Sequence, residues 1–300
     1  MTGGGFDGKV ALVTGASRGV GAAIAVALAA AGAQVACAAR STAVAPQRTP
    51  GTLDDTVARI DAAGGRAIAV PTNLADPADV EAMVARTVAE LGRLDILVNN
   101  AAITFVGDLD IPLARHDLVM AVNLHAPLIA SRAAVPHLRA AGGGRILNVS
   151  SVAALVPFPG LMSYGISKIA LERLTVDLAR QLQGDAIAVN CFRIDLPVAS
   201  EGFVANTPGA DRSTWEPCEV AAEGVLWMLQ QPATYSGRRE SMLGLRQREG
   251  IMASQAAVPT GGVPITELYD GLAADGGTVF AEPYDHKPYD DRADDDEVRS

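Results

Sequence analysis

Three side chains in the middle of the chain have types and spacings suited to moving a proton. Lys168 follows Tyr164 by four positions, and Ser151 precedes the tyrosine by thirteen. Apolar residues recur at helical spacing over Ser163–Gln183, so the tyrosine and the lysine lie one turn apart on the same helix face. A phenol titrates near pH ~10, and a nearby ammonium lowers that pKa. With a serine hydroxyl bound to the same oxygen, these groups could protonate a carbonyl or deprotonate an alcohol.

A second pattern, near the N-terminus, is typical of a nucleotide-binding turn. An apolar strand over Val10–Val13 leads into a glycine-rich turn and then an alanine-rich helix over Ala22–Ala31. Gly15 permits the tight turn, Gly19 lets the backbone approach a pyrophosphate, and Gly21 allows close packing of helix and strand. The free N–H groups at the helix N-terminus would bind the phosphates. Strand, turn and helix together predict a dinucleotide site.

Jointly, these patterns resemble the short-chain dehydrogenase/reductase family, and the resemblance extends to about residue 240. It implies that Tyr164 is the acid or base, that Lys168 lowers its pKa and holds the nicotinamide ribose, and that Ser151 orients the substrate oxygen. Asn123 would hold a water that relays protons to the lysine. The cofactor residues that the resemblance implies are Gly15, Ser17, Arg18, Gly19, Val20, Gly21, Arg40, Ser41, Asn73, Leu74, Asn100, Ala101, Ala102, Tyr164, Lys168, Leu196 and Val198.

The end of the second predicted strand indicates which cofactor is used. An acidic residue there would bind the ribose 2′-hydroxyl and repel a 2′-phosphate, but this chain has Ala39, followed by Arg40. Arg18, in the glycine turn, lies on the same side in family members. Two guanidinium groups and no carboxylate favour a phosphate dianion, so we expect NADP(H). The alternative is that both arginines are ordinary surface charges. Asn73 takes the place of the acidic residue that meets the adenine in the family, and its amide oxygen could accept the same hydrogen bond.

The chain departs from the family pattern around the nicotinamide. The Asn-Asn-Ala-Gly loop of the family ends here in Ala102. Ile194-Asp195 replaces the usual Pro-Gly, and Pro197 falls where a backbone N–H normally meets the carboxamide, so it cannot donate. Ala199 replaces a threonine, for which Ser200 could substitute. These changes affect the nicotinamide anchor and leave the four catalytic residues untouched.

Strands and helices alternate along the chain, which predicts a parallel sheet covered on both faces. We expect an α/β fold, a Rossmann-type doubly wound parallel sheet in three layers, with ligands beyond the carboxyl ends of the strands. One domain would span residues 1–255, followed by a Pro/Gly/Asp-rich tail over residues 256–300. Pro127 and Pro136 are expected to bend or end the long fourth helix. The expected strands are Val10–Val13, Gln34–Ala38, Ala67–Val70, Leu94–Val98, Arg145–Val149, Ala186–Cys191 and Arg239–Leu243, and the expected helices are Ala22–Ala31, Leu53–Ala63, Pro77–Leu91, Leu113–Leu138, Ser163–Gln183 and Pro217–Gln230.

Composition narrows the classes of partner. A net charge of −10 argues against nucleic acid. The apolar run Ala22–Ala31 is too short to span a bilayer, and the first residues lack an apolar signal core. Three cysteines without metal-ligand spacing predict no metal site. We expect a cytoplasmic homo-oligomer, a tetramer or a dimer, that acts on a small molecule. The tail would be solvated or would anchor on a neighbouring subunit.

The predicted pocket walls indicate the substrate class. Ile103–Phe105, Val152–Met162 and Leu196–Phe203 are mostly apolar, which favours an apolar ketone or secondary alcohol. The loop Arg48–Thr52 resembles the hydroxysteroid-dehydrogenase-like subgroup of the family. One alternative is a reductase of carrier-bound 3-oxoacyl groups, which would need a basic patch at the pocket mouth. Another is a non-catalytic NADP(H)-binding sensor or scaffold, although such proteins usually lose the tyrosine or the lysine.

Overall fold

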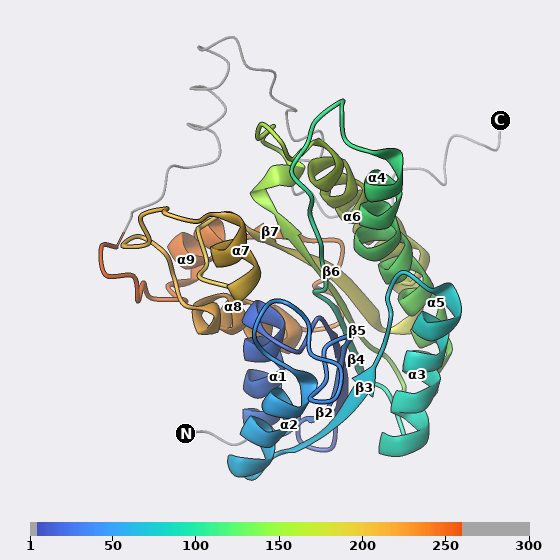
Figure 1. Ribbon diagram of the computed structural model, residues 1–300. Coiled ribbons are helices and arrows are strands. Elements are labelled where there is room, and N and C mark those ends of the chain that lie inside the picture. The colour runs from blue at the N-terminus through green and yellow to red at the C-terminus, as the bar shows by residue number, and fades with distance from the viewer. Residues whose placement is uncertain (1–4, 260–300) are drawn as a thin grey trace, which may run out of the picture.

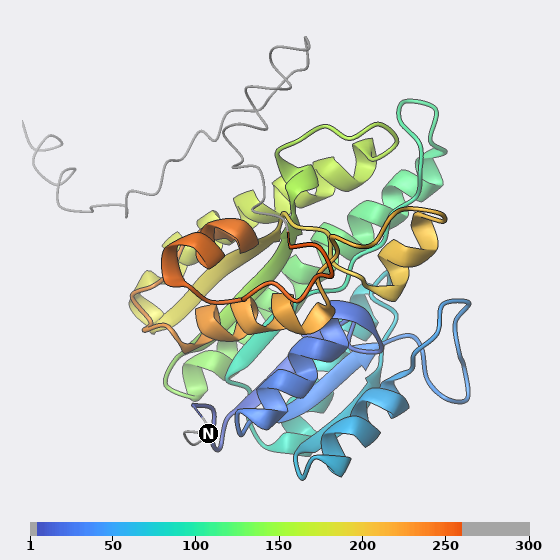
Figure 2. The ribbon, with the colours of Figure 1, turned by 90° about the vertical axis from the view of Figure 1, so that its left-hand side faces the viewer.

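The computed structural model describes residues 5–259, which form a seven-stranded parallel sheet with helices on both faces (Figures 1 and 2). The strand order is β3-β2-β1-β4-β5-β6-β7, and the neighbouring strands run parallel. The order reverses between β1 and β4, which is where such sheets bind ligands. The expected Rossmann-type fold is therefore confirmed. The strands are β1 (Val10–Thr14), β2 (Gln34–Ala39), β3 (Arg66–Pro71), β4 (Ile96–Asn99), β5 (Gly144–Ser151), β6 (Ile187–Ile194) and β7 (Arg239–Ser241).

The helices form two layers, one on each face of the sheet (Figure 1). Successive strand residues point to opposite faces, so Val13 packs with α1 and α8 while Leu12 packs with α3 and α5. Both side chains are fully buried. The helices are α1 (Gly19–Ala30), α2 (Leu53–Ala62), α3 (Pro77–Leu91), α4 (Leu113–Met120), α5 (Ala126–Ala140), α6 (Met162–Gln181), α7 (Glu201–Asn206), α8 (Cys218–Gln230) and α9 (Met242–Glu249), with a π-helical turn at Ala121–His125 and 3₁₀ turns at Val152–Ala154 and Gln183–Asp185.

The fourth predicted helix continues through Pro136. Pro136 lies inside α5, so the expectation that it could end the helix is wrong. Four further residues follow it, and Leu138 packs fully buried against the sheet, so tertiary packing holds the last turn. Pro127 lies in the first turn of α5, where its missing N–H costs little. The irregularity between α4 and α5 is the π-helical turn.

The last strand is shorter than expected because a helix begins directly after it. The prediction placed a strand over Arg239–Leu243, whereas β7 ends at Ser241. The hydroxyl of Ser241 accepts a 2.9 Å hydrogen bond from the backbone N–H of Gly244 and caps α9. A serine in that position favours a helix start over strand continuation.

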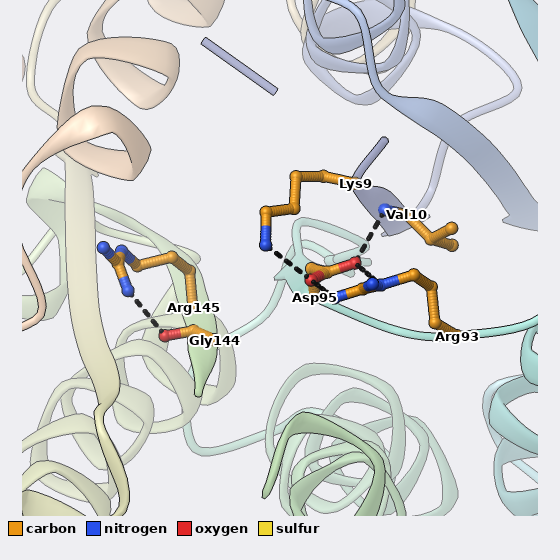
Figure 3. Close-up of polar contacts among 6 residues, drawn as sticks. All are labelled: Lys9, Val10, Arg93, Asp95, Gly144 and Arg145. Atoms are coloured by element: carbon orange, nitrogen blue, oxygen red, sulfur yellow. Dashed lines mark hydrogen bonds and ion pairs between the residues drawn. The ribbon is translucent and has the colours of Figure 1, made fainter. Parts of the chain in front are cut away.

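A buried carboxylate joins β1 and β4 at the amino ends of the strands (Figure 3). Asp95 accepts hydrogen bonds from the backbone N–H of Val10 at 3.0 Å, from Lys9 Nζ at 3.0 Å and from Arg93 Nη2 at 2.7 Å. Burial alone would raise the pKa of Asp95, but these donors outweigh it and hold the pKa below its usual range. On the same edge, Arg145 donates to the carbonyl of Gly144 at 3.0 Å (Figure 3). This cluster stabilises the edge opposite to the predicted site.

The last described residues, on both sides of the predicted boundary between domain and tail, contact the rest of the domain. Gln255 donates its N–H to the carboxylate of Glu216 at 2.8 Å, and Val258 donates its N–H to the carbonyl of Ser213 at 2.8 Å. Most of the tail assigned to residues 256–300 lies outside the described residues, and the boundary at residue 255 stays a prediction.

One helical stretch in the described part, Leu113–Ala140, is long and apolar enough to cross a membrane, with a mean hydropathy of 1.4. In its most apolar window, 39% of the residues are buried inside the fold, where α5 packs against α3 and the sheet. Core helices pass the same test, so this stretch is weak evidence for a membrane segment.

Candidate active site

The glycine turn has the backbone geometry that a pyrophosphate requires. Gly15 and Gly19 have φ values of +69° and +58°, in the left-handed region that favours glycine. A Cβ atom on Gly21 would lie 2.3 Å from the carbonyl oxygen of Gly15. Among the described residues no side chain caps the N-terminus of α1, which leaves its first N–H groups available to an anion. The turn therefore fits a dinucleotide phosphate.

Thr14 fixes the neighbouring loop beside this turn. Its hydroxyl oxygen accepts from the backbone N–H groups of Asn100 and Ala101, at 3.0 and 3.1 Å. The side-chain amide of Asn100 donates to the Thr14 carbonyl at 2.9 Å. A Cβ atom on Gly15 would lie 2.9 Å from the Cα atom of Ala101, so the two segments touch. Ala102 follows in an exposed position.

Ser151, Tyr164 and Lys168 come together at the carboxyl end of β5. The Ser151 hydroxyl lies near the Tyr164 phenol and acts to lower the pKa of that phenol. Lys168 lies one turn along α6, with Nζ 5.6 Å from the centre of the tyrosine ring. The ammonium also donates to the carbonyl of Val149 at 2.8 Å, and the lysine is only 2% exposed. The arrangement places a phenol, a hydroxyl and a desolvated ammonium at one site.

Asn123 lies in the π-helical turn and is fully buried. Its Oδ1 accepts from the N–H of Ile103 at 2.8 Å, and its Nδ2 donates to the Ile103 carbonyl at 2.9 Å and to Ser167 Oγ at 3.0 Å. These bonds tie the loop after β4 to α6. Because the Asn123 side chain already makes these three hydrogen bonds, the predicted relay water would have to bind the main-chain carbonyl of Asn123. A π turn changes the hydrogen bonding of that carbonyl from the regular α-helical pattern.

The pKa of the tyrosine differs from the sequence-based expectation. Burial raises the pKa of Tyr164, and the hydrogen bond from Ser151 only partly opposes this. Burial also lowers the pKa of Lys168 to about 8. A low dielectric penalises the charged form of each group, so both shift towards neutrality. The protein alone therefore holds Tyr164 as the neutral acid, and a phenolate needs a further positive charge, which an oxidised nicotinamide would supply.

Arg18 and Ser41, two of the predicted cofactor-binding residues, hold the loop after β2. Arg18 donates from Nη2 to the carbonyls of Thr49 and Gly51, at 2.8 and 2.7 Å. Ser41 donates its hydroxyl hydrogen to the same Gly51 carbonyl at 2.9 Å. Gly51 has a φ of +100°, and a Cβ atom there would lie 2.7 Å from a backbone oxygen of the glycine turn. The loop thus closes against the turn.

Arg40, by contrast, is exposed, and within residues 5–259 no hydrogen bond or ion pair occupies its guanidinium. Asn73 is exposed at the end of β3, where its Oδ1 accepts from the N–H of Ala75 at 3.3 Å. Ser17, Val20 and Leu74 are buried nearby.

The segment after β6 crosses the glycine turn. Leu196 and Val198 are buried, and the main chain pairs with Glu216 through the N–H of Ala199 at 2.9 Å. A Cβ atom on Gly19 would lie 3.1 Å from the Cβ atom of Ser200 and 3.3 Å from Oε2 of Glu201. The start of α7 therefore lies next to Gly19 of the glycine turn.

A buried ion pair, which was not predicted from the sequence, lies next to the predicted catalytic residues. Glu172 lies one turn beyond Lys168 on α6 and is held by Arg193 of β6 through bonds of 2.8 and 2.6 Å. Both side chains are almost completely buried. The available signal was a glutamate at a position that the helical period assigns to the buried face of α6.

Comparisons with known proteins agree with this geometry. The sequence model of the short chain dehydrogenase family matches residues 9–195. A 2-(R)-hydroxypropyl-CoM dehydrogenase of Xanthobacter autotrophicus is 34% identical over 244 residues, which are 76% of this chain and 93% of that protein. Hydroxysteroid dehydrogenase-like protein 2 of Danio rerio is 31% identical over 81% of this chain; the match spans only 59% of that relative.

Solved structures of dehydrogenases are similar to this chain in both sequence and fold. A short-chain dehydrogenase from Burkholderia cenocepacia, in complex with NADP, is 36% identical with a TM-score of 0.70, over 79% of this chain and 96% of that one. A dehydrogenase from Xanthomonas campestris is 30% identical with a TM-score of 0.76, over 87% of this chain and 98% of that one. The family match, the fold and the grouping of Ser151, Tyr164 and Lys168 all lead to one conclusion: the chain belongs to the short-chain dehydrogenase/reductase family of oxidoreductases.

Proposed function

We propose that this protein is an NADP(H)-dependent oxidoreductase that reduces a ketone, or oxidises a secondary alcohol, on a mainly apolar substrate. The observation that carries the proposal is the grouping of Tyr164, Ser151 and Lys168, with Lys168 one helical turn from the tyrosine and its Nζ 5.6 Å from the centre of the tyrosine ring. In support, the name of the Xanthobacter relative describes a 2-hydroxypropyl group, which is a secondary alcohol.

Each residue has a stated task in the reaction. When bound, the nicotinamide supplies or accepts the hydride. Tyr164 donates the proton to the carbonyl oxygen in reduction, and its raised pKa keeps it protonated for that step. Ser151 binds the same oxygen, and Lys168 holds the ribose and places a positive charge near the developing phenolate. Asn123 fixes the loop after β4 against α6.

The apolar character of the substrate is supported by side chains around the site. Phe158, Met162 and Phe203 are 40%, 36% and 42% exposed on segments that border it. Phe203 also stacks on Trp215, with ring centres 4.6 Å apart, which gives the mouth an aromatic wall. Large apolar side chains that remain exposed at a site mark it for an apolar ligand.

The testing experiment is a panel of carbonyl compounds assayed by NADPH absorbance and repeated with NADH. The panel contains terpenoid and steroid ketones, a 3-oxoacyl thioester and small polar aldehydes. We expect turnover of the apolar ketones with a clear preference for NADPH. Turnover of only the small polar carbonyls would refute the substrate class, and a preference for NADH would refute the cofactor.

We also propose that the protein works in the cytoplasm as a homo-oligomer. Leu113 of α4 and Ile166 and Ile169 of α6 are 77%, 43% and 38% exposed, and the two helices pack side by side. Exposed apolar side chains on adjacent helices favour association. Light scattering of the purified protein would measure the assembly, and a monomer at micromolar concentration would contradict it.

A further inference from the structure

The buried pair of Glu172 and Arg193 has no part in the proton transfer described above. Arg193 donates to both carboxylate oxygens of Glu172, and a second guanidinium, that of Arg239, lies 3.6 Å from Oε2. The exposed fractions of these side chains are 0% for Glu172, 2% for Arg193 and 6% for Arg239. Such a cluster costs a large desolvation free energy and is often no more stabilising than apolar residues of the same size. Stability alone therefore gives a weak reason for it.

Its position gives a stronger reason. Glu172 is four residues after Lys168, so the two side chains lie on the same buried face of α6. Arg193 stands opposite Ser150 in the ladder of β5 and β6, next to Ser151. The cluster thus lies next to the turn of α6 that carries Lys168.

Other groups around Lys168 do not provide a fixed negative charge. The Val149 carbonyl and the hydroxyls of Ser150 and Ser151 come from β5, and these are neutral. The titratable and charged groups that surround the site are Tyr164 and Glu172 on α6, Cys191 and Arg193 on β6, Arg239 on β7, and His116 on α4, whose Nδ1 lies 3.0 Å from Ser163 Oγ. Burial raises the pKa of Cys191, which keeps its thiol neutral. Among the described residues, Glu172 is the carboxylate whose charge acts to raise the pKa of Lys168.

We propose that Glu172 is a positioning residue for Lys168: bound by Arg193, it holds a fixed negative charge one helical turn from the lysine and keeps that ammonium charged at a buried position. The inference rests on the proposed function only for its catalytic consequence. The coupling itself is a property of the folded protein. Burial lowers the pKa of Lys168 to about 8, and the charge of Glu172 acts in the opposite direction, as the proposal requires.

The chain allows a direct measurement because it contains three lysines: Lys9, Lys168 and Lys287. In protein labelled with ¹³C-lysine, the pH titration of the Lys168 Cε signal reports the charge of this group by NMR, and the other two signals are internal references. The variant Glu172→Gln keeps the shape but removes the charge. We expect the Lys168 titration to move to lower pH by about one unit or more, since an opposite charge one helical turn away has been removed. The alkaline limb of kcat/KM for ketone reduction should move in the same direction.

Asp177→Asn is the matched control, because Asp177 is on the same helix and forms an exposed ion pair with Arg173 at 2.9 Å. It should leave the titration and the pH profile unchanged. Glu172→Gln removes the carboxylate that Arg193 binds, and the single variant could fail to fold for that reason. In that case the double variant Glu172→Gln/Arg193→Gln, which keeps a neutral hydrogen-bonding pair, is used to test the coupling. The same direction of shift is expected in it.

The outcomes separate the two proposals. A Lys168 titration in the Glu172 variants equal to that of the wild type and of Asp177→Asn would overturn the inference, even if activity fell through loss of structure. A shifted titration in a protein that reduces no carbonyl would support the coupling and count against the proposed function.

Discussion

The ammonium of Lys168 donates a 2.8 Å hydrogen bond to the carbonyl oxygen of Val149. This bond spans from α6 to β5 and ends two residues before Ser151. It uses one of the three N–H donors of the lysine, so two remain for the ribose and for water. Strand β5, which carries Ser151, thereby also positions the Lys168 ammonium beside Tyr164.

The first prediction concerns pH. Lys168 has a folded pKa of about 8, below its ordinary value of 10.5. Its ammonium is therefore present below that pH and is lost as the pH rises through it. We expect kcat/KM for ketone reduction to fall above about pH 8, while the raised pKa of Tyr164 keeps the phenol protonated. Steady-state rates across the range test this, with circular dichroism as the control for unfolding. A flat profile well into the alkaline range would contradict it.

The second prediction concerns the proton donor. Replacing Tyr164 by phenylalanine should lower kcat by about 10²–10⁴-fold, the usual contribution of a general acid, and leave NADPH affinity nearly unchanged. Single-turnover rates and fluorescence titration with NADPH measure the two quantities. Tyr235→Phe is the control, because that hydroxyl bonds to Glu240, away from the site. Comparable activity of the Tyr164 variant would remove the tyrosine from the mechanism.

The third prediction separates the two arginines. Arg40→Ala should raise the KM for NADPH by roughly 10-fold or more and leave NADH unaffected, because a charge-assisted contact to the 2′-phosphate is lost. Arg18→Ala should instead release the loop at Thr49–Gly51, which limited proteolysis would detect as faster cleavage there. Arg59→Ala, on the exposed side of α2, is the control. Equal losses with both cofactors in Arg40→Ala would show that Arg40 does not read the phosphate.

The fourth prediction concerns stability. Asp95→Asn should lower the free energy of unfolding by about 2–3 kcal/mol, because Lys9 and Arg93 lose a charged acceptor at a buried position. In the wild type this contribution is present above the unfolded-state pKa of about 3.9. It is lost as the pH falls through the lowered pKa of Asp95.

Urea denaturation at neutral and acid pH measures both effects. Glu90→Gln, which breaks the exposed ion pair with Arg86, should change stability by no more than about 0.5 kcal/mol. If the two variants behaved alike, the buried cluster at Asp95 would not be a stabilising contact.

The fold could be predicted from the sequence because its signals are local. The apolar strand before Gly15 and the proline after Asp76 mark element boundaries by chemistry that acts within a few residues. In α3 the structure follows that chemistry closely: Asp76 accepts from the N–H of Ala78 at 2.9 Å, and Pro77 begins the helix. The grouping of Ser151 with Tyr164 was likewise expected, from the resemblance to the short-chain dehydrogenase/reductase family.

The remaining features depend on contacts between distant segments, which a single sequence does not encode in a local pattern. Arg18 was expected at the phosphate, but the carbonyls of Thr49 and Gly51 compete for its guanidinium. The pKa of Tyr164 was expected to fall, but burial, which raises that pKa, outweighs the opposing effect of the Ser151 side chain. The pairing of Glu172 with Arg193 depends on how α6 lies across β6.

The position of β1 inside the sheet, between β2 and β4, has a consequence for how the chain folds. On one side β1 pairs with β2, the next strand along the chain. On the other side it pairs with β4, where Ala11 lies opposite Ile96, so the two strands are far apart in the sequence. The βαβ unit of β1, α1 and β2 can form early during synthesis. The second partner of β1 arrives only after three crossovers, and closing so long a loop is slow. Refolding should therefore be limited by the step that brings the two halves of the sheet together.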